Sequence, residues 1–258
     1  MRLLVSFHVL VTSLALVFPT MIGVALGAEA PKDATAATKA ANDKLLKELP
    51  FDNTQAFKDA HKGFIAPLPD EAVKGKSGNV IWNPTQYGFI KEGDKAPATV
   101  NPSLWRQSQL ITISGLFEVT DGIYQVRNQD LSNMTIIEGD KGVVVVDPMV
   151  SMETAKVGMD LYYKHRGKKP VIAVIYTHSH VDHYGGVRGV VDEADVKSGK
   201  TKIFASVGFL EHAVAENVMA GTAMSRRASY MYGNLLPPSP KGQIGAGLAP
   251  LRRQARSL

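Results

Sequence analysis

The pattern of hydrophobic and polar positions divides the chain after about Ile111 into short strands and longer helices. Short apolar runs rich in β-branched residues are typical of strands, and longer segments with apolar residues three or four positions apart are typical of helices. The pattern predicts strands at 122–127, 134–138, 143–146, 171–176 and 202–205, and helices at 153–165 and 207–219. This order fits an α/β fold in which two packed sheets are covered by helices.

The segment before this core is less regular. Residues 36–49 have helical spacing and are rich in alanine and lysine, so we expect a loosely attached helical arm. Residues 51–102 are interrupted repeatedly by proline, glycine and asparagine, which predicts an irregular segment wrapping across the core. The predicted divisions are therefore 31–110 for the arm and wrapping segment and 111–248 for the core.

The first thirty residues differ in kind from the rest. Arg2 precedes a mostly apolar stretch, and Ala28-Glu29-Ala30 has the small residues of a cleavage site. Residues 1–30 are therefore predicted to be a secretory signal peptide, with an uncleaved membrane anchor as the alternative. No other segment of the sequence is long and apolar enough to span a bilayer. We expect a periplasmic or secreted protein with no stable membrane span after cleavage.

Composition narrows the chemistry that the chain can perform. With 45% hydrophobic and 21% charged residues, its 258 residues suit a globular protein of one or two domains. The absence of cysteine excludes disulfides, thiolate ligands and a cysteine nucleophile. A net charge of +5 favours anionic substrates. The basic residues are scattered rather than striped, so nucleic acid is not an expected partner.

The candidate chemistry is concentrated directly after the predicted strand 171–176, in His178, His180, Asp182 and His183. Alternate side chains of an extended segment share a face, so the first two histidines can bind one ion. A following helical turn would direct Asp182 and His183 toward a second ion. Imidazoles and carboxylates are ligands of Zn²⁺. Solvent-facing loop histidines are the alternative, although three of only seven histidines lie in this run.

Other residues have two interpretations each. Asp147, at the end of the strand 143–146, either orients a metal-binding residue or caps the turn before Pro148. His212 and Glu216 are expected to be helix-surface or packing residues. Arg226 and Tyr230 are candidates for binding a substrate oxyanion, with a surface charge and aromatic packing as the alternative.

The H-x-H-x-D-H run with Tyr184-Gly185-Gly186-Val187 resembles the signature of the metallo-β-lactamase superfamily. The flanking sequence resembles one branch of this superfamily, the secreted alkylsulfatases that hydrolyse dodecyl sulfate. The stretches that carry this resemblance are residues 101–106, 115–127, 130–135 and 226–230. The resemblance runs from about Phe51 to about Leu248. It implies an αββα sandwich and two Zn²⁺ ions that activate water to hydrolyse an anionic alkyl sulfate ester. Asp182 is then the expected catalytic residue as well as a ligand.

The resemblance also implies further acidic and imidazole ligands far downstream of His183. Residues 249–258 look unlike the family and are interpreted as an atypical, frameshifted tail that leaves the fold truncated. Full-length members form homodimers through a helical domain, and no such domain is found in this sequence. We therefore expect little sulfatase activity from this chain alone. The alternatives are another hydrolase of this fold, acting on lactams, lactones or thioesters, and a non-catalytic exported fragment.

Overall fold

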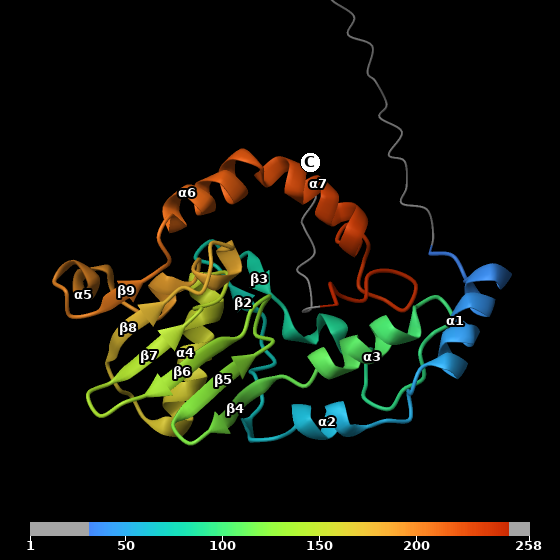
Figure 1. Cartoon of the computed structure of the whole chain (residues 1–258), viewed down its shortest axis with the longest axis horizontal. Helices are drawn as coiled ribbons and strands as arrows, with labels where there is room; N and C mark the ends of the chain where they lie inside the picture. The colour runs from blue at the N-terminus through green and yellow to red at the C-terminus, as the bar shows by residue number, and fades with distance from the viewer. Residues whose placement is uncertain (1–30, 248–258) are drawn as a thin grey trace, which may run out of the picture. The chain divides into compact units, whose positions relative to one another are not determined.

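The computed structural model describes residues 31–247 (Figure 1). The predicted signal peptide at 1–30 and the predicted tail at 249–258 lie outside the described residues. Among residues 31–247, every helix is too short or too polar to cross a membrane.

The described chain is built around a seven-stranded sheet in the order β1-β4-β5-β6-β7-β8-β9, and β2 and β3 form a separate two-stranded ribbon. The neighbours from β1 to β7 are antiparallel, whereas β7, β8 and β9 are parallel. The strands are β1 (Phe64–Ala66), β2 (Val73–Lys74), β3 (Val80–Trp82), β4 (Gly115–Thr120), β5 (Ile123–Arg127), β6 (Met134–Glu138), β7 (Val143–Val146), β8 (Val171–Ile175) and β9 (Lys202–Phe204).

The helices lie before, between and after the strands. They are α1 (Ala36–Glu48), α2 (Gln55–Ala60), α3 (Pro102–Ile111), α4 (Met152–Arg166), α5 (Glu193–Lys197), α6 (Phe209–Val214) and α7 (Gly221–Tyr232). The described residues also form the short 3-10 turns η1 (Pro84–Tyr87), η2 (Val181–His183) and η3 (Val187–Gly189). A π-helical turn, η4 (Ala215–Met219), joins α6 to α7. The mixed α/β class predicted from the sequence is confirmed.

The core forms where one face of the sheet packs against α4, which lies behind the strands in Figure 1. The strand register places Tyr124, Ile136, Val145 and Val174 side by side across β5 to β8. All four side chains are buried, because side chains of one parity along each strand point to the covered face. Gly158 of α4 allows the helix to approach Met134 and Val126 closely.

The predicted helix at 153–165 and the strands at 122–127, 134–138 and 143–146 are found within one or two residues of their expected ends. Strand β4 was missed. The continuous apolar run of the strand predicted at 171–176 is typical of a strand buried on both faces, but the structure buries only one face. Val174 is buried but Ile175 is 36% exposed, because α4 covers only one face of the sheet. After His183 the chain forms the short turn η3.

The arm and wrapping segment contain more regular structure than their composition suggests. The predicted helix at 36–49 is α1, none of whose side chains is buried. Its attachment includes Asn42, whose side-chain amide donates to the carbonyls of Ala98 and Val100. Residues 51–102 contribute α2, β1, β2, β3 and η1, and β1 joins the edge of the large sheet.

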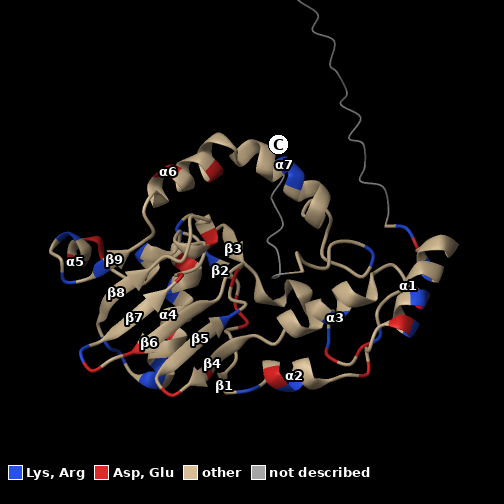
Figure 2. Cartoon of the chain, in the orientation of Figure 1, with Lys and Arg blue, Asp and Glu red and all other residues tan. Residues whose placement is uncertain are grey.

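Charged groups of both signs are interspersed over the described helices and loops (Figure 2). Many exposed cations lie beside an acidic partner, as in the pairs Lys156–Asp160, Arg188–Glu193 and Lys200–Asp195. Such exposed pairs contribute little to stability, since water and salt screen them. The charged side chains therefore form no extended positive or negative patch on the described helices and loops.

One ion-pair cluster at the end of β6 is better shielded and predicts a pH effect. Hydrogen bonds from Arg166, Tyr162 and Lys169 lower the pKa of Glu138 to about 2. A carboxyl group with a lowered folded-state pKa stabilises the fold above its unfolded pKa, and this contribution is lost as the pH falls toward the folded value. We expect the urea midpoint of Glu138→Gln to lie below wild type at pH 7 and to approach it at pH 3.

The matched control for this measurement is Glu71→Gln, because Glu71 is exposed. Its urea midpoint should follow that of wild type at both pH values. A stability difference for Glu138→Gln that stays constant from pH 7 to pH 3 would contradict the lowered pKa.

Candidate metal centre

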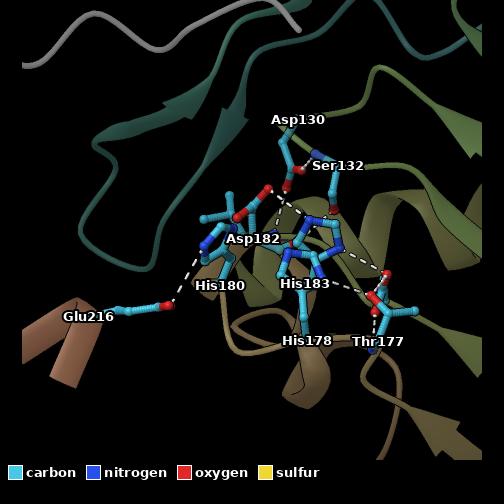
Figure 3. Close-up of polar contacts among 10 residues, drawn as sticks. Asp130, Ser132, Thr177, His178, His180, Asp182, His183 and Glu216 are labelled. Carbon is cyan, nitrogen blue, oxygen red and sulfur yellow. Dashed lines mark hydrogen bonds and ion pairs between the residues drawn. The ribbon is translucent and has the colours of Figure 1, made fainter. Parts of the chain in front are cut away.

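The metal loop, residues 177–183, begins directly after the parallel strand β8. The backbone bends at His178 and Ser179, His180 is extended, and the turn η2 follows. The three imidazoles converge as a result (Figure 3). The ring centroids of His178 and His180 are 4.6 Å apart, and those of His178 and His183 are 4.0 Å apart. The sequence prediction that these side chains gather at a strand end matches this geometry.

Asp147 holds both ends of the metal loop. Its Oδ1 accepts from the Thr177 backbone N–H at 2.8 Å, and its Oδ2 accepts from Thr177 Oγ1 at 2.6 Å. His183 Nδ1 lies 2.8 Å from the same Oδ2. Asp147 is buried and adopts a left-handed backbone with φ of 54°, a conformation that is uncommon outside glycine. Of the two roles considered for Asp147, these contacts agree with orienting the metal loop.

The hydrogen bonds leave a consistent set of ring nitrogens for a metal ion. Nδ1 of His178 contacts Thr177 Oγ1 at 2.9 Å, and Nδ1 of His183 contacts Asp147. Both histidines therefore keep Nε2 for coordination. A hydrogen bond at Nδ1 fixes the tautomer of a histidine that binds metal through Nε2. Donor atoms of Asp147, His178 and His183 lie within 4.8 Å of one another, close enough to surround a divalent cation. Because both carboxylate oxygens of Asp147 already accept hydrogen bonds, we assign Asp147 to orienting the loop and keep the two histidines as ligands.

Asp182 and His180 occupy the outer side of the cluster. Asp182 Oδ2 lies 3.2 Å from His183 Nε2, so this carboxylate faces the nitrogen that the previous contacts leave free. The His180 side chain is 55% exposed and its Nε2 lies 3.6 Å from Glu216 Oε2. All four predicted ligands are therefore brought together on one short loop.

Glu216 is a site residue that the sequence prediction missed. Its Oε2 accepts from Ser179 Oγ at 3.1 Å in addition to facing His180. The neighbouring Asn217 donates to the Ser179 carbonyl at 3.4 Å and to the Tyr184 hydroxyl oxygen at 3.3 Å. Both residues belong to the π-helical turn η4, a type of turn that is frequent at functional sites. No pattern in the sequence indicated that η4 lies against the metal loop.

An aromatic cluster holds α6 beside the loop. The ring of Tyr176 stacks on that of Phe209 at 5.4 Å, and the ring of Tyr184 meets Phe209 edge-on at 5.2 Å. Burial raises the pKa of Tyr176 to about 12, so its hydroxyl remains protonated across the physiological range. His212, on the same helix, is exposed, as predicted for a surface residue.

The two candidate substrate residues lie on α7. Arg226 is exposed and Tyr230 is 92% exposed. Within residues 31–247 no hydrogen bond or ion pair links either side chain to the metal loop. Their role in binding an oxyanion stays a prediction.

Comparison with known proteins identifies the class of domain that this centre belongs to. Residues 127–244 match the model of the Metallo-beta-lactamase superfamily. This match agrees with the resemblance that the metal loop carries. This fold implies binding of a divalent metal.

Several relatives of the chain are alkylsulfatases. The chain is 76% identical over 226 residues to a linear primary-alkylsulfatase from a Pseudomonas species, covering 88% of this chain and 34% of the relative. It is 52% identical over 217 residues to the alkyl/aryl-sulfatase BDS1 of Saccharomyces cerevisiae, covering 84% of this chain and 33% of the relative. The chain spans about a third of the length of these relatives.

A solved structure agrees with the sequence comparison. The stereoselective inverting sec-alkylsulfatase Pisa1 from a Pseudomonas species is 50% identical and superposes with a TM-score of 0.80, covering 86% of this chain and 35% of that one. The predicted metallo-β-lactamase-type fold is thereby confirmed for the matched part of the chain.

Proposed function

We propose that the metal loop is part of a zinc-dependent hydrolase that cleaves alkyl sulfate esters, with an anionic alkyl sulfate such as dodecyl sulfate as substrate. The observation that supports this most strongly is the convergence of His178, His180 and His183 in a chain 76% identical to a linear primary-alkylsulfatase. A net charge of +5 also suits an anionic substrate.

The four loop residues divide between two ions in this proposal. His178 and His180 would hold the first, and Asp182 with His183 would hold the second. When bound, zinc supplies an acidified water and neutralises negative charge on the ester and the departing group. Imidazole and carboxylate donors without thiolates agree with zinc sites of hydrolytic rather than purely structural type.

The chain's own residues prepare the loop for this chemistry. Asp147 fixes the ring of His183 through Nδ1 and so directs Nε2 toward Asp182. Asp182, whose carboxylate borders the reacting region, is the proposed catalytic residue.

Two further parts of the proposal concern the cell and the substrate. The composition of residues 1–30 supports export to the periplasm or beyond. Arg226 and Tyr230 are proposed to contact the sulfate group, because a guanidinium recognises tetrahedral oxyanions through paired hydrogen bonds. Homodimer formation remains an expectation from the resemblance.

A substrate panel tests the reaction class. The chain, supplied with zinc, is assayed with octyl sulfate below its micelle concentration, with nitrocefin, and with a lactone and a thioester. We expect release of inorganic sulfate to exceed hydrolysis of the other three substrates, even if the rate is low, and to stop on addition of a chelator. Preferential cleavage of nitrocefin, the lactone or the thioester would assign a different hydrolase. Absence of turnover from all four would support a non-catalytic fragment.

A further inference from the structure

A buried acidic residue outside the metal loop, Asp130, is the centre of a hydrogen-bond network that reaches the loop (Figure 3). Asp130 is 1% exposed and lies between β5 and β6. Its Oδ1 accepts from the Ser132 backbone N–H at 3.1 Å. Its Oδ2 accepts from the Val150 N–H at 3.0 Å and from Thr154 Oγ1 at 2.5 Å. One carboxylate therefore joins the β5–β6 connection to the start of α4.

Ser132 carries this network into the metal loop. Its side chain is almost fully buried, and its Oγ donates to the backbone carbonyl of Asp182 at 2.5 Å. This carbonyl belongs to the peptide that joins Asp182 to His183. We propose that Asp130 and Ser132 are positioning residues that fix this peptide, and with it the directions of the two side chains that bind metal. The inference rests on the proposed function only in taking the loop as metal-binding.

The network supplies a restraint that Asp147 does not. Asp147 holds Thr177 and the ring of His183, so its contacts act on the two ends of the loop. Ser132 acts on the backbone between them. The Asp130 carboxylate shapes the Ser132 position through an Asx turn, in which an aspartate accepts from the backbone two residues on. Peptide orientation and ring orientation are thus set by two separate carboxylates.

The burial of the Asp130 carboxylate is energetically unfavourable, which indicates that the network has a functional role. Asp130 forms no ion pair within the described part of the chain, and burying a carboxylate without a cation is unfavourable. Burial raises the pKa of Asp130 to about 6, and the hydrogen bonds from Thr154, Ser132 and Val150 oppose that rise. The group is therefore ionised at pH 7.5, where three donors face it.

Cobalt binding tests the proposal independently of sulfatase activity. The full chain is titrated with Co²⁺ at pH 7.5, and the visible absorption of the bound ion reports both affinity and coordination geometry. We expect Ser132→Ala to bind cobalt about 10- to 100-fold more weakly and with an altered spectrum. The matched control is Ser198→Ala at the exposed end of α5. It also removes a serine hydroxyl that donates to a backbone carbonyl, here that of Asp195. This control should match wild type in affinity and spectrum.

A second pair of variants separates positioning from a general loss of folding. Thr154→Ser keeps the hydroxyl that donates to Asp130, whereas Thr154→Val keeps the shape and removes the donor. We expect cobalt binding close to wild type for the serine variant and weakened binding for the valine variant. The valine variant also loses the contacts of this hydroxyl with Ser151, so the thermal midpoints of the metal-free valine and serine variants should differ by several degrees while both chains remain folded.

The outcomes are distinguishable from those of the substrate panel. Wild-type affinity and spectrum in both Ser132→Ala and Thr154→Val would overturn the positioning role and leave the proposed function standing. Wild-type chain that binds cobalt but releases no sulfate would contradict only the proposed function. Failure of the wild-type chain to bind cobalt would overturn both.

Discussion

Replacing Asp147 with alanine is expected to weaken zinc binding by about 10- to 100-fold and to destabilise the fold by about 2–5 kcal/mol. The substitution removes the acceptor for the Thr177 N–H, the Thr177 hydroxyl and His183 Nδ1 at once. The loop then loses the restraint at both of its ends, and polar groups in a partly buried region lose their partner. Zinc affinity is measured by competition with a chromophoric chelator, and stability by urea unfolding of the metal-free chain.

Two further variants show whether the carboxylate itself is responsible. Asp147→Asn keeps the size and tolerates the left-handed backbone, with φ of 54°, better than alanine does. We expect it to recover part of the stability but not the zinc affinity, because an amide offers only one acceptor oxygen. Asp140→Ala, at an exposed turn, is the control for loss of an aspartate and should match wild type. Zinc affinity of Asp147→Ala equal to that of wild type would exclude the orienting role.

Replacing Gly186 with alanine is expected to destabilise the chain by at least about 3 kcal/mol and to displace the metal loop. The backbone at this position has φ of −84°, which any residue adopts, so the requirement for glycine is one of space. An added Cβ would collide with the carbonyl oxygens of Pro148 and Ser151 and with the side chain of Ala155. The variant would force apart the loop and the start of α4, and thermal unfolding with circular dichroism measures the loss.

The control for added volume is Gly221→Ala. A Cβ at Gly221 has only the Glu216 carbonyl oxygen at 4.0 Å, and alanine favours the helix α7 that begins there. This variant should unfold at or slightly above the wild-type temperature. A Gly186→Ala variant as stable as Gly221→Ala would show that the close approach is not required.

The elements of the core could be predicted from the sequence because their patterns are local. The valine run of β7 and the helix α4 each carry their own periodicity, and the four loop ligands lie within six residues. The gathering of His178, His180, Asp182 and His183 therefore needed only the geometry of a strand end followed by a turn.

The missed features depend on contacts between distant segments. Glu216 meets the metal loop thirty-six residues after His180. The packing of Tyr176 and Tyr184 on Phe209 and the hydrogen bonds of Asn217 hold it there. The apolar composition of β8 is typical of a strand buried on both faces, whereas its actual exposure depends on which helices cover the sheet. Gly186 permits close contact with the start of α4, and no local pattern in the sequence indicates that contact.

Zinc content of the purified full chain tests the central claim most directly. The chain is saturated with zinc, passed through a desalting column and analysed by mass spectrometry of the metal, beside a His178→Ala/His183→Ala double variant. We expect at least one zinc ion to be retained per wild-type chain and nearly all zinc to be lost from the double variant. Substoichiometric zinc in the wild-type chain, or equal zinc in both proteins, would contradict a metal centre in the loop 177–183.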